Sequence, residues 1–152
     1  MKIQLSPQRI VPNVTTVWNV PGPEVDIVMD LKKLTFAEGF IDTIYSFQVL
    51  DHYFPLEVPE ALANWYRCLK PDGKLWIKVD DFEWLCREFV GGGLNIDTFN
   101  REFTHPMYFT QDIATRYLIE AGFPGEKLII WFANVPNEFI KEQHELVLEA
   151  KK

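Results

Sequence analysis

The middle of the chain contains two apolar strands separated by one amphipathic helix. Residues 41–49 (IDTIYSFQV) and 74–79 (KLWIKV) are apolar enough to form buried strands. Between them, apolar residues recur at the spacing of a helix with one buried face, at Val58, Leu62, Trp65, Tyr66 and Leu69. Strands that alternate with helices are typical of a mostly parallel sheet with helices on its faces. The segment therefore predicts an α/β protein.

Three further strands are predicted before this segment, and a hairpin is predicted after it. The early strands are 2–5, 14–18 and 25–31. Only eight residues separate the first two, so we expect a short irregular connection, because a parallel crossover with a helix needs a dozen or more. Residues 127–133 and 144–149 are expected to pair as an antiparallel hairpin, joined by a polar loop around Pro136-Asn137. The whole chain, 1–152, is predicted to be one three-layer domain.

Two more helices are predicted in the second half of the chain. Asp80 and Asp81 can cap the N-terminus of the first helix. Its apolar positions are Phe82, Leu85, Cys86 and Phe89. The second helix begins at Thr110 and ends before Gly122, a residue suited to the position after a helix. Residues 94–108 lack a regular period, and we interpret them either as a lid over the sheet edge or as packed surface.

Composition limits the partners that this chain is expected to have. Its formal charge of −7 would repel a phosphate backbone, so nucleic acid is not expected to bind. No apolar run approaches the roughly 18 residues of a membrane span, so no membrane partner is expected. Met1-Lys2 leads directly into a strand without the pattern of a secretory signal, which predicts a cytoplasmic protein. Cys68 and Cys86 fall on predicted helices and are interpreted as buried thiols.

Several segments in order resemble one family of enzymes. They are Val25–Leu31, Ile41–Ser46, Val49–His52, Arg67–Leu75 and Phe109–Phe123. This series is similar to the class I S-adenosylmethionine-dependent methyltransferases, especially their small bacterial and phage members. The resemblance implies a Rossmann-like seven-stranded sheet whose C-terminal strands are antiparallel. It also implies S-adenosylmethionine as cofactor and methyl transfer to a small-molecule or protein acceptor.

The predicted cofactor site departs from the pattern of this family. Its members commonly have Leu-Gly-Cys-Gly after the first strand, where this chain has Leu5-Ser6-Pro7-Gln8. Glycines allow positive φ and close approach to a ligand, whereas proline fixes φ and removes a donor. The family's acidic residue at the end of the second strand is also absent, since Trp18-Asn19 stands there. The residues that the resemblance assigns to the cofactor are Leu5, Ser6, Asp30, Leu31 and Phe47.

Asp51 and His52 are the predicted catalytic residues. They follow the fourth strand, and open α/β sheets bind ligands beyond the carboxyl ends of their strands. A histidine there can act as a general base or orient a substrate, although such a pair can also make loop hydrogen bonds only. No metal site is predicted, because His52, His105 and His144 are far apart in the sequence and lack metal-ligand spacing.

The sequence leaves two functions open. The chain can be a methyltransferase that binds its cofactor through a rebuilt first loop. Methyl transfer depends mainly on positioning an activated methyl group, so unusual site residues are compatible with it. Alternatively, the loss of the loop glycines and of the second-strand carboxylate favours a catalytically silent scaffold or partner subunit in a homo- or hetero-oligomer. The fold alone does not decide between them.

Overall fold

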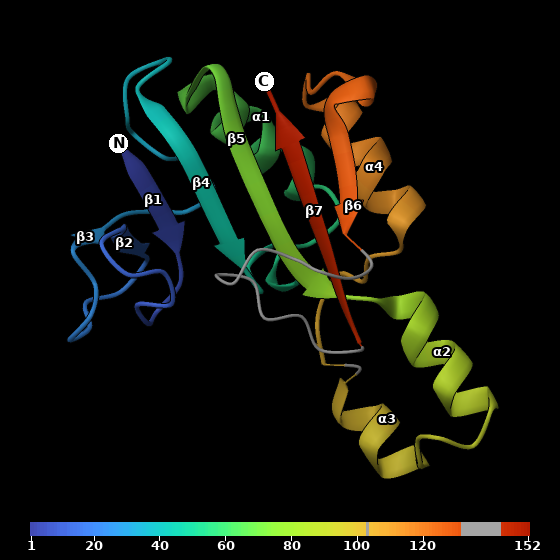
Figure 1. Ribbon diagram of the computed structural model, residues 1–152. Helices are drawn as coiled ribbons and strands as arrows, with labels where there is room; N and C mark the ends of the chain where they lie inside the picture. The colour runs from blue at the N-terminus through green and yellow to red at the C-terminus, as the bar shows by residue number, and fades with distance from the viewer. Residues whose placement is uncertain (103, 132–143) are drawn as a thin grey trace.

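The computed structural model describes residues 1–102, 104–131 and 144–152, which form a seven-stranded sheet with helices (Figure 1). The strands are β1 (Lys2–Leu5), β2 (Thr15–Trp18), β3 (Ile27–Val28), β4 (Ile41–Phe47), β5 (Leu69–Asp80), β6 (Leu128–Trp131) and β7 (Glu145–Lys151). The α-helices are α1 (Val58–Cys68), α2 (Phe82–Val90), α3 (Ile96–Glu102) and α4 (Gln111–Glu120). Two 3₁₀ turns cover Leu50–His52 and Gly125–Lys127.

The strand order in the sheet is β3-β2-β1-β4-β5-β7-β6. The strands from β1 to β5 pair in parallel, while β7 runs antiparallel to both β5 and β6. This confirms the predicted mostly parallel sheet with a reversed C-terminal hairpin. The predicted loop around Pro136-Asn137 and the predicted strand end at Ala133 lie outside the described residues. Because the strand order reverses between β1 and β4, a crevice for ligands is expected at the carboxyl ends of the neighbouring strands.

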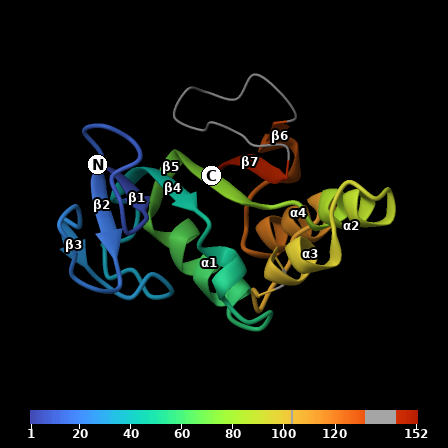
Figure 2. The ribbon, with the colours of Figure 1, turned by 90° about the horizontal axis from the view of Figure 1, so that it is seen from below.

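Helix α1 covers one face of the sheet with the apolar stripe that the sequence predicts. Its buried residues are Val58, Ala61, Leu62, Trp65 and Cys68. They pack in one core cluster with Ala114 and Leu118 of α4 and with strand residues such as Ile44 and Leu75. In Figure 2 both helices lie on the same side of the strands. This cluster is the main hydrophobic core of the part of the chain that the structure describes.

The opposite face of the sheet has a smaller buried cluster. Its buried cluster consists of strand residues such as Tyr45, Phe47 and Trp76 together with Val11 and Val14 of the first loop. Among the described residues, no helix contributes to this cluster. The reason is that the connections from β1 to β2 and from β2 to β3 are both too short for a helix. The short, irregular first connection predicted from the sequence is therefore confirmed.

A buried glutamine organises the first connection in place of a helix. Gln4, completely buried in β1, donates through Nε2 to the hydroxyl of Thr16 at 2.8 Å. Its Oε1 accepts from the backbone N–H groups of Ile10 and Val11 at 3.1 and 2.8 Å. These bonds pair polar atoms that would otherwise be costly to bury. The side chain of Gln4 thus holds the loop against the sheet.

Four local predictions are corrected. The third strand covers only Ile27–Val28 instead of 25–31, because it lies at the sheet edge, where the side chain of Val28 is half exposed. Strand β5 starts at Leu69 instead of Lys74, and its pairing with β4 is irregular between these two residues. The segment 94–108 contains helix α3, which lies with α2 beyond the carboxyl ends of β4 and β5 in Figure 1. Cys68 is buried as predicted, but Cys86 is only partly so.

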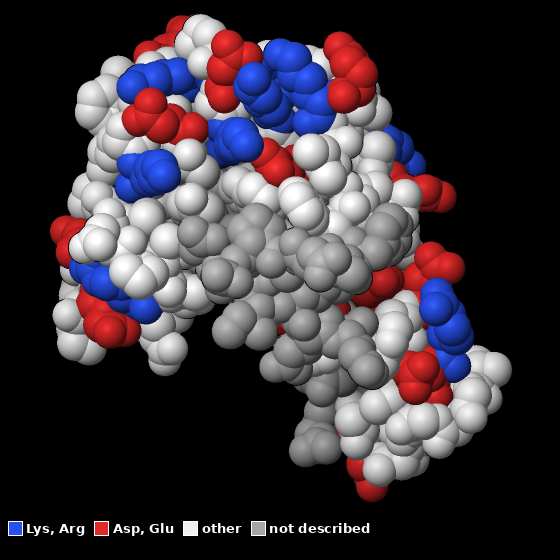
Figure 3. All heavy atoms as spheres, in the orientation of Figure 1, with Lys and Arg blue, Asp and Glu red and all other residues white. Residues whose placement is uncertain are grey.

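Charged side chains of both signs are interspersed on the face shown in Figure 3. Several form ion pairs across strands, such as Lys74 with Glu149 at 2.6 Å. In the ranges that the structure describes, no helix is both long and apolar enough to cross a membrane.

One ion pair at the start of β4 predicts a pH dependence of stability. Lys70 donates to Asp42 at 2.8 Å, and together with the amino group of Met1 it lowers the pKa of Asp42 from 3.8 to about 2. A depressed pKa stabilises the fold above the unfolded value, and that contribution is lost as pH falls from about 4 towards 2. We expect Asp42→Asn to lower the melting temperature at pH 7 but not near pH 2, as measured by circular dichroism. An equal effect at both pH values would contradict the assignment, and added salt should reduce the effect at pH 7 because Asp42 is exposed.

Candidate active site

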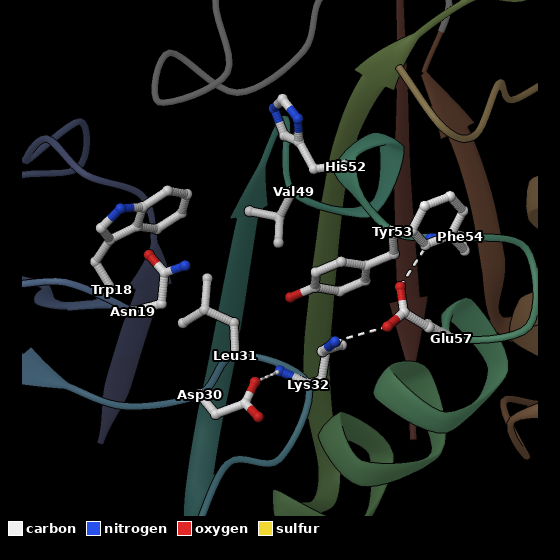
Figure 4. A pocket seen from close by; sticks show the side chains of 10 residues that line it. All are labelled: Trp18, Asn19, Asp30, Leu31, Lys32, Val49, His52, Tyr53, Phe54 and Glu57. Carbon is white, nitrogen blue, oxygen red and sulfur yellow. Dashed lines mark hydrogen bonds and ion pairs between the residues drawn. The ribbon is translucent and has the colours of Figure 1, made fainter.

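A pocket of about 470 Å³ opens at the carboxyl ends of β2, β3 and β4 (Figure 4). Its lining residues are Trp18, Asn19, Asp30, Leu31, Lys32, Val49, His52, Tyr53, Phe54 and Glu57. They come from the end of β2, the loop after β3 and the segment between β4 and α1. The volume lies within the range of small-molecule sites, and the position is the one at which open α/β sheets bind ligands.

The loop after β3 is fixed on both sides of the pocket by hydrogen bonds. The Asp30 carboxylate accepts from the backbone N–H of Lys32 at 2.9 Å, which closes a turn typical of aspartate. The indole N–H of Trp65, from α1, donates to the carbonyl of Leu31 at 2.6 Å. The ammonium of Lys32 pairs with Glu57 at 2.7 Å. Helix α1 therefore positions the residues that form one wall of the pocket.

Ionisation in the pocket follows from these contacts. The hydrogen bond with Lys32 lowers the pKa of Glu57, and the same bond raises the pKa of Lys32, so both groups are charged at neutral pH. Burial, reinforced by the charges of Asp30 and Glu57, raises the pKa of Tyr53 well above its ordinary value. Tyr53 consequently stays a neutral phenol that can donate a hydrogen bond but does not act as a base.

A second group of polar residues lies beside this pocket, beyond the ends of β4 and β5. Asp51 is 2% exposed, and its Oδ2 lies 2.5 Å from Nδ1 of His105. The backbone N–H of Met107 donates to the carbonyl of Asp51 at 3.2 Å, which ties the segment of His105 to the end of β4. The ring of His105 stacks on that of His52, with centroids 4.6 Å apart.

Two further carboxylates, a half-buried one at Asp80 and a buried one at Glu145, extend this group towards β7. The side-chain amide of Gln48 donates to Asp80 at 3.1 Å and to Glu145 at 3.4 Å, and Lys78 pairs with Glu145 at 2.8 Å. Burial and the charge of nearby Asp51 raise the pKa of Asp80. Gln48 itself has a φ of +50°, an uncommon conformation outside glycine that is frequent at functional sites.

Comparison with known proteins finds a matching family model and solved structures with a similar fold. Residues 9–77 match the family model of a methyltransferase domain. The whole fold superimposes on a S-adenosylmethionine-dependent methyltransferase from Archaeoglobus fulgidus with a TM-score of 0.67 and 12% identity, over 99% of this chain and 85% of that one. The chain therefore has the fold of the class I methyltransferases. No curated protein matches its sequence.

Two further solved structures share the methyltransferase fold. One, described as a possible histamine N-methyltransferase from Thermotoga maritima, has a TM-score of 0.67 at 15% identity and covers 99% of this chain and 80% of that chain. The other is 1,6-didemethyltoxoflavin-N1-methyltransferase from Burkholderia thailandensis, solved with 1,6-didemethyltoxoflavin and S-adenosylhomocysteine. Its TM-score is 0.64 at 18% identity, over 99% and 70% of the two chains. The predicted resemblance to class I methyltransferases is confirmed.

The predicted cofactor residues fall into two groups. Asp30 and Leu31 line the pocket. Leu5, Ser6 and Phe47 do not belong to its lining. Leu5 is completely buried in the core, the hydroxyl of Ser6 accepts from the N–H of Gln8 at 3.2 Å within its own turn, and Phe47 belongs to the cluster on the opposite face. Trp18, which stands where the family has an acidic residue, forms part of the pocket wall.

Of the predicted catalytic pair, His52 lines the pocket, whereas Asp51 is buried beside it and is not a lining residue. The structure corrects two related inferences. His52 and His105, remote in the sequence, are adjacent in space. Of the two predicted capping aspartates, Asp81 caps α2 by accepting from Glu83 and Trp84, but Asp80 faces Gln48 instead. Sequence reasoning missed Lys32, Tyr53 and Glu57, although Tyr53 directly follows the Asp51-His52 pair.

Proposed function

We propose that this methyltransferase domain binds S-adenosylmethionine in the pocket of Figure 4 and transfers its methyl group to a small-molecule or protein acceptor. The observation that carries the proposal is the pocket itself. It lies at the carboxyl ends of β2, β3 and β4, has the volume of a small-molecule site, and contains Asp30 and Leu31, which the family resemblance assigns to the cofactor.

The residues of the pocket suit an adenosine derivative. Trp18 offers an aromatic surface, and the carboxylate of Asp30 can accept hydrogen bonds from amino or hydroxyl groups. Tyr53 can donate from its neutral phenol. When bound, S-adenosylmethionine would supply an activated methyl group on a sulfonium. His52, one of the lining residues, would then orient the acceptor towards that group, with the buried Asp51 next to it. Orientation of the acceptor is the main requirement of methyl transfer.

One observation favours the alternative, a silent binding protein that acts as scaffold or as partner subunit. Leu5 and Ser6 stand where the family's glycine-rich loop contacts the cofactor, yet both are buried, and the Ser6 hydroxyl is engaged in its own turn. The chain would therefore hold the cofactor with fewer contacts than its relatives have. Cofactor binding is the property that separates the two functions.

Isothermal titration calorimetry with S-adenosylmethionine and S-adenosylhomocysteine tests this proposal. We expect micromolar binding of one ligand per chain. Asp30→Asn should weaken binding about 10-fold or more, because a hydrogen bond to a charged group contributes about 1.5–3 kcal/mol. Asp97→Asn, an exposed carboxylate at the start of α3, serves as matched control and should bind as the natural chain does.

Absence of binding at sub-millimolar ligand concentrations would overturn the proposed methyltransferase function and would favour the silent scaffold or partner subunit. Equal weakening by Asp30→Asn and Asp97→Asn would show that binding, if present, takes place outside this pocket. Replacing Ser6-Pro7-Gln8 with Gly-Cys-Gly addresses the first loop separately. Cofactor binding gained by that variant alone would identify the loop as the cause of a silent site.

A further inference from the structure

The chain has three histidines, and two of them meet around a buried aspartate. Asp51, His52 and His105 each offer one nitrogen or oxygen ligand atom, and these atoms all lie within 4.8 Å of one another. Asp51 and His52 come from the 3₁₀ turn after β4, whereas His105 comes from the segment between α3 and α4. Two remote parts of the sequence therefore present metal-binding atoms to one point.

The contact between Asp51 and His105 lacks the alignment of a hydrogen bond. Their atoms Oδ2 and Nδ1 lie 2.5 Å apart, yet neither atom has a hydrogen-bond partner of acceptable geometry, and the same holds for Oδ1 of Asp51. The side chain of Asp51 is 3% exposed. A buried carboxylate without hydrogen bonds is costly, and a cation bound by both atoms would compensate for that cost.

The surroundings add negative charge to this point. Asp80 and Glu145, with side-chain exposures of 17% and 7%, are linked to each other through Gln48. Lys78 pairs with Glu145, and His144 lies 4.0 Å from Asp80. Among the described residues, the ion pair of Asp51 is with a histidine, not with lysine or arginine. A divalent cation beside Asp51 would reduce the repulsion among these carboxylates.

We propose that Asp51, His52 and His105 bind one divalent transition-metal ion of the zinc type. Two imidazole nitrogens and one carboxylate oxygen suit such ions. A site with three protein ligands leaves a coordination position open, as in metal sites that bind substrates. Because His52 also lines the pocket, this position adjoins the pocket and can take an oxygen, nitrogen or sulfur atom of an acceptor. Metal binding itself does not depend on the proposed function.

Small side-chain movements suffice to close the site. With metal–ligand distances near 2.0–2.1 Å, ligand atoms around a tetrahedral ion lie about 3.4 Å apart. Oδ2 of Asp51 and Nδ1 of His105 would separate slightly from 2.5 Å, while the ligand atom of His52 would approach them. His52 is exposed, so its ring can rotate without disturbing the core.

Titration of the full chain with ZnCl₂, without S-adenosylmethionine, tests this proposal by calorimetry. We expect one ion per chain and an increase of the melting temperature on binding. Removal of a residue that only supports a metal ligand weakens metal binding about 10–100-fold. His52→Ala and His105→Ala remove ligands themselves, so each should weaken binding by at least this much. His144→Ala, which removes the third histidine, is the matched control and should leave affinity within about 3-fold of the natural chain, far below that loss.

Three results would overturn the metal site. They are no binding of Zn²⁺ to the natural chain, unchanged affinity in His52→Ala and His105→Ala, and an equal loss of affinity in His144→Ala. Should His105→Ala unfold, His52→Ala decides, because an exposed side chain can be removed without loss of the fold. Since the titration omits the cofactor, failure of metal binding is distinguishable from failure of cofactor binding.

Discussion

Trp65→Ala is expected to lower the free energy of unfolding by about 3–5 kcal/mol, the usual cost of removing a large aromatic side chain from a core. Trp65 is completely buried at the centre of the stripe of α1. It also donates the 2.6 Å hydrogen bond to Leu31 that fixes the loop after β3. Because small domains are stable by only about 5–15 kcal/mol, much of the stability should be lost. The pocket wall at Asp30 should loosen at the same time.

Urea unfolding followed by circular dichroism measures this effect, and Trp65→Phe is the graded control. Phenylalanine retains most of the packing but leaves the carbonyl of Leu31 without its donor, which costs about 1–3 kcal/mol when buried. We therefore expect the order natural chain, Trp65→Phe, Trp65→Ala in decreasing stability. A destabilisation below about 1 kcal/mol for Trp65→Ala would show that this residue does not anchor the core.

Phe109→Ala is expected to cost a similar amount, about 3–5 kcal/mol, and to disturb the polar group at the sheet edge as well. Phe109 is 1% exposed and packs in the main core. Its carbonyl accepts from the N–H of Phe82 at 2.9 Å, which fixes the segment before α4 to the end of β5. Met107, two residues earlier, bonds to Asp51. Loss of the ring should therefore release the segment that carries His105.

The matched control for this variant is Phe40→Ala, which makes the same chemical change at a side chain that is 47% exposed. We expect its unfolding free energy to fall by less than about 1 kcal/mol. Amide hydrogen exchange gives the second measurement. Protection of Met107 should decrease in Phe109→Ala and stay unchanged in Phe40→Ala. Similar destabilisation by both variants, or unchanged exchange at Met107, would contradict the anchoring role.

Local sequence patterns were sufficient to predict the helices and strands that pack a whole face against the core. Helix α1 was predicted because its apolar residues repeat at helical spacing, and β4 and β5 because apolar runs of that length are typical of strands buried on both faces. Thr110 and Gly122 marked the ends of α4 because capping depends on residues next to each other in sequence. The parallel order followed from the alternation of these elements.

Elements at the margins of the sheet could not be predicted as well. Residues 25–31 are apolar enough for a long strand, yet an edge position pairs only Ile27 and Val28. Helix α3 has no apolar stripe from which it could be predicted, because it contacts mainly α2 and not the core. Asp80 resembled a cap because it stands beside Asp81, but only the path of the chain decides which carboxylate reaches the helix.

The sequence by itself determined the α/β class, the strand directions, the methyltransferase resemblance and the carboxyl end of β4 as the location of Asp51 and His52. Each of these depends on local spacing or on contiguous motifs. Only the tertiary structure decided that Leu31 and Asp30 share a pocket with Trp18, and that His105 lies against Asp51. For His105 and Asp51 the physical reason is that packing of α4 and its preceding segment against the core brings together residues more than fifty positions apart, and no local pattern records such a contact.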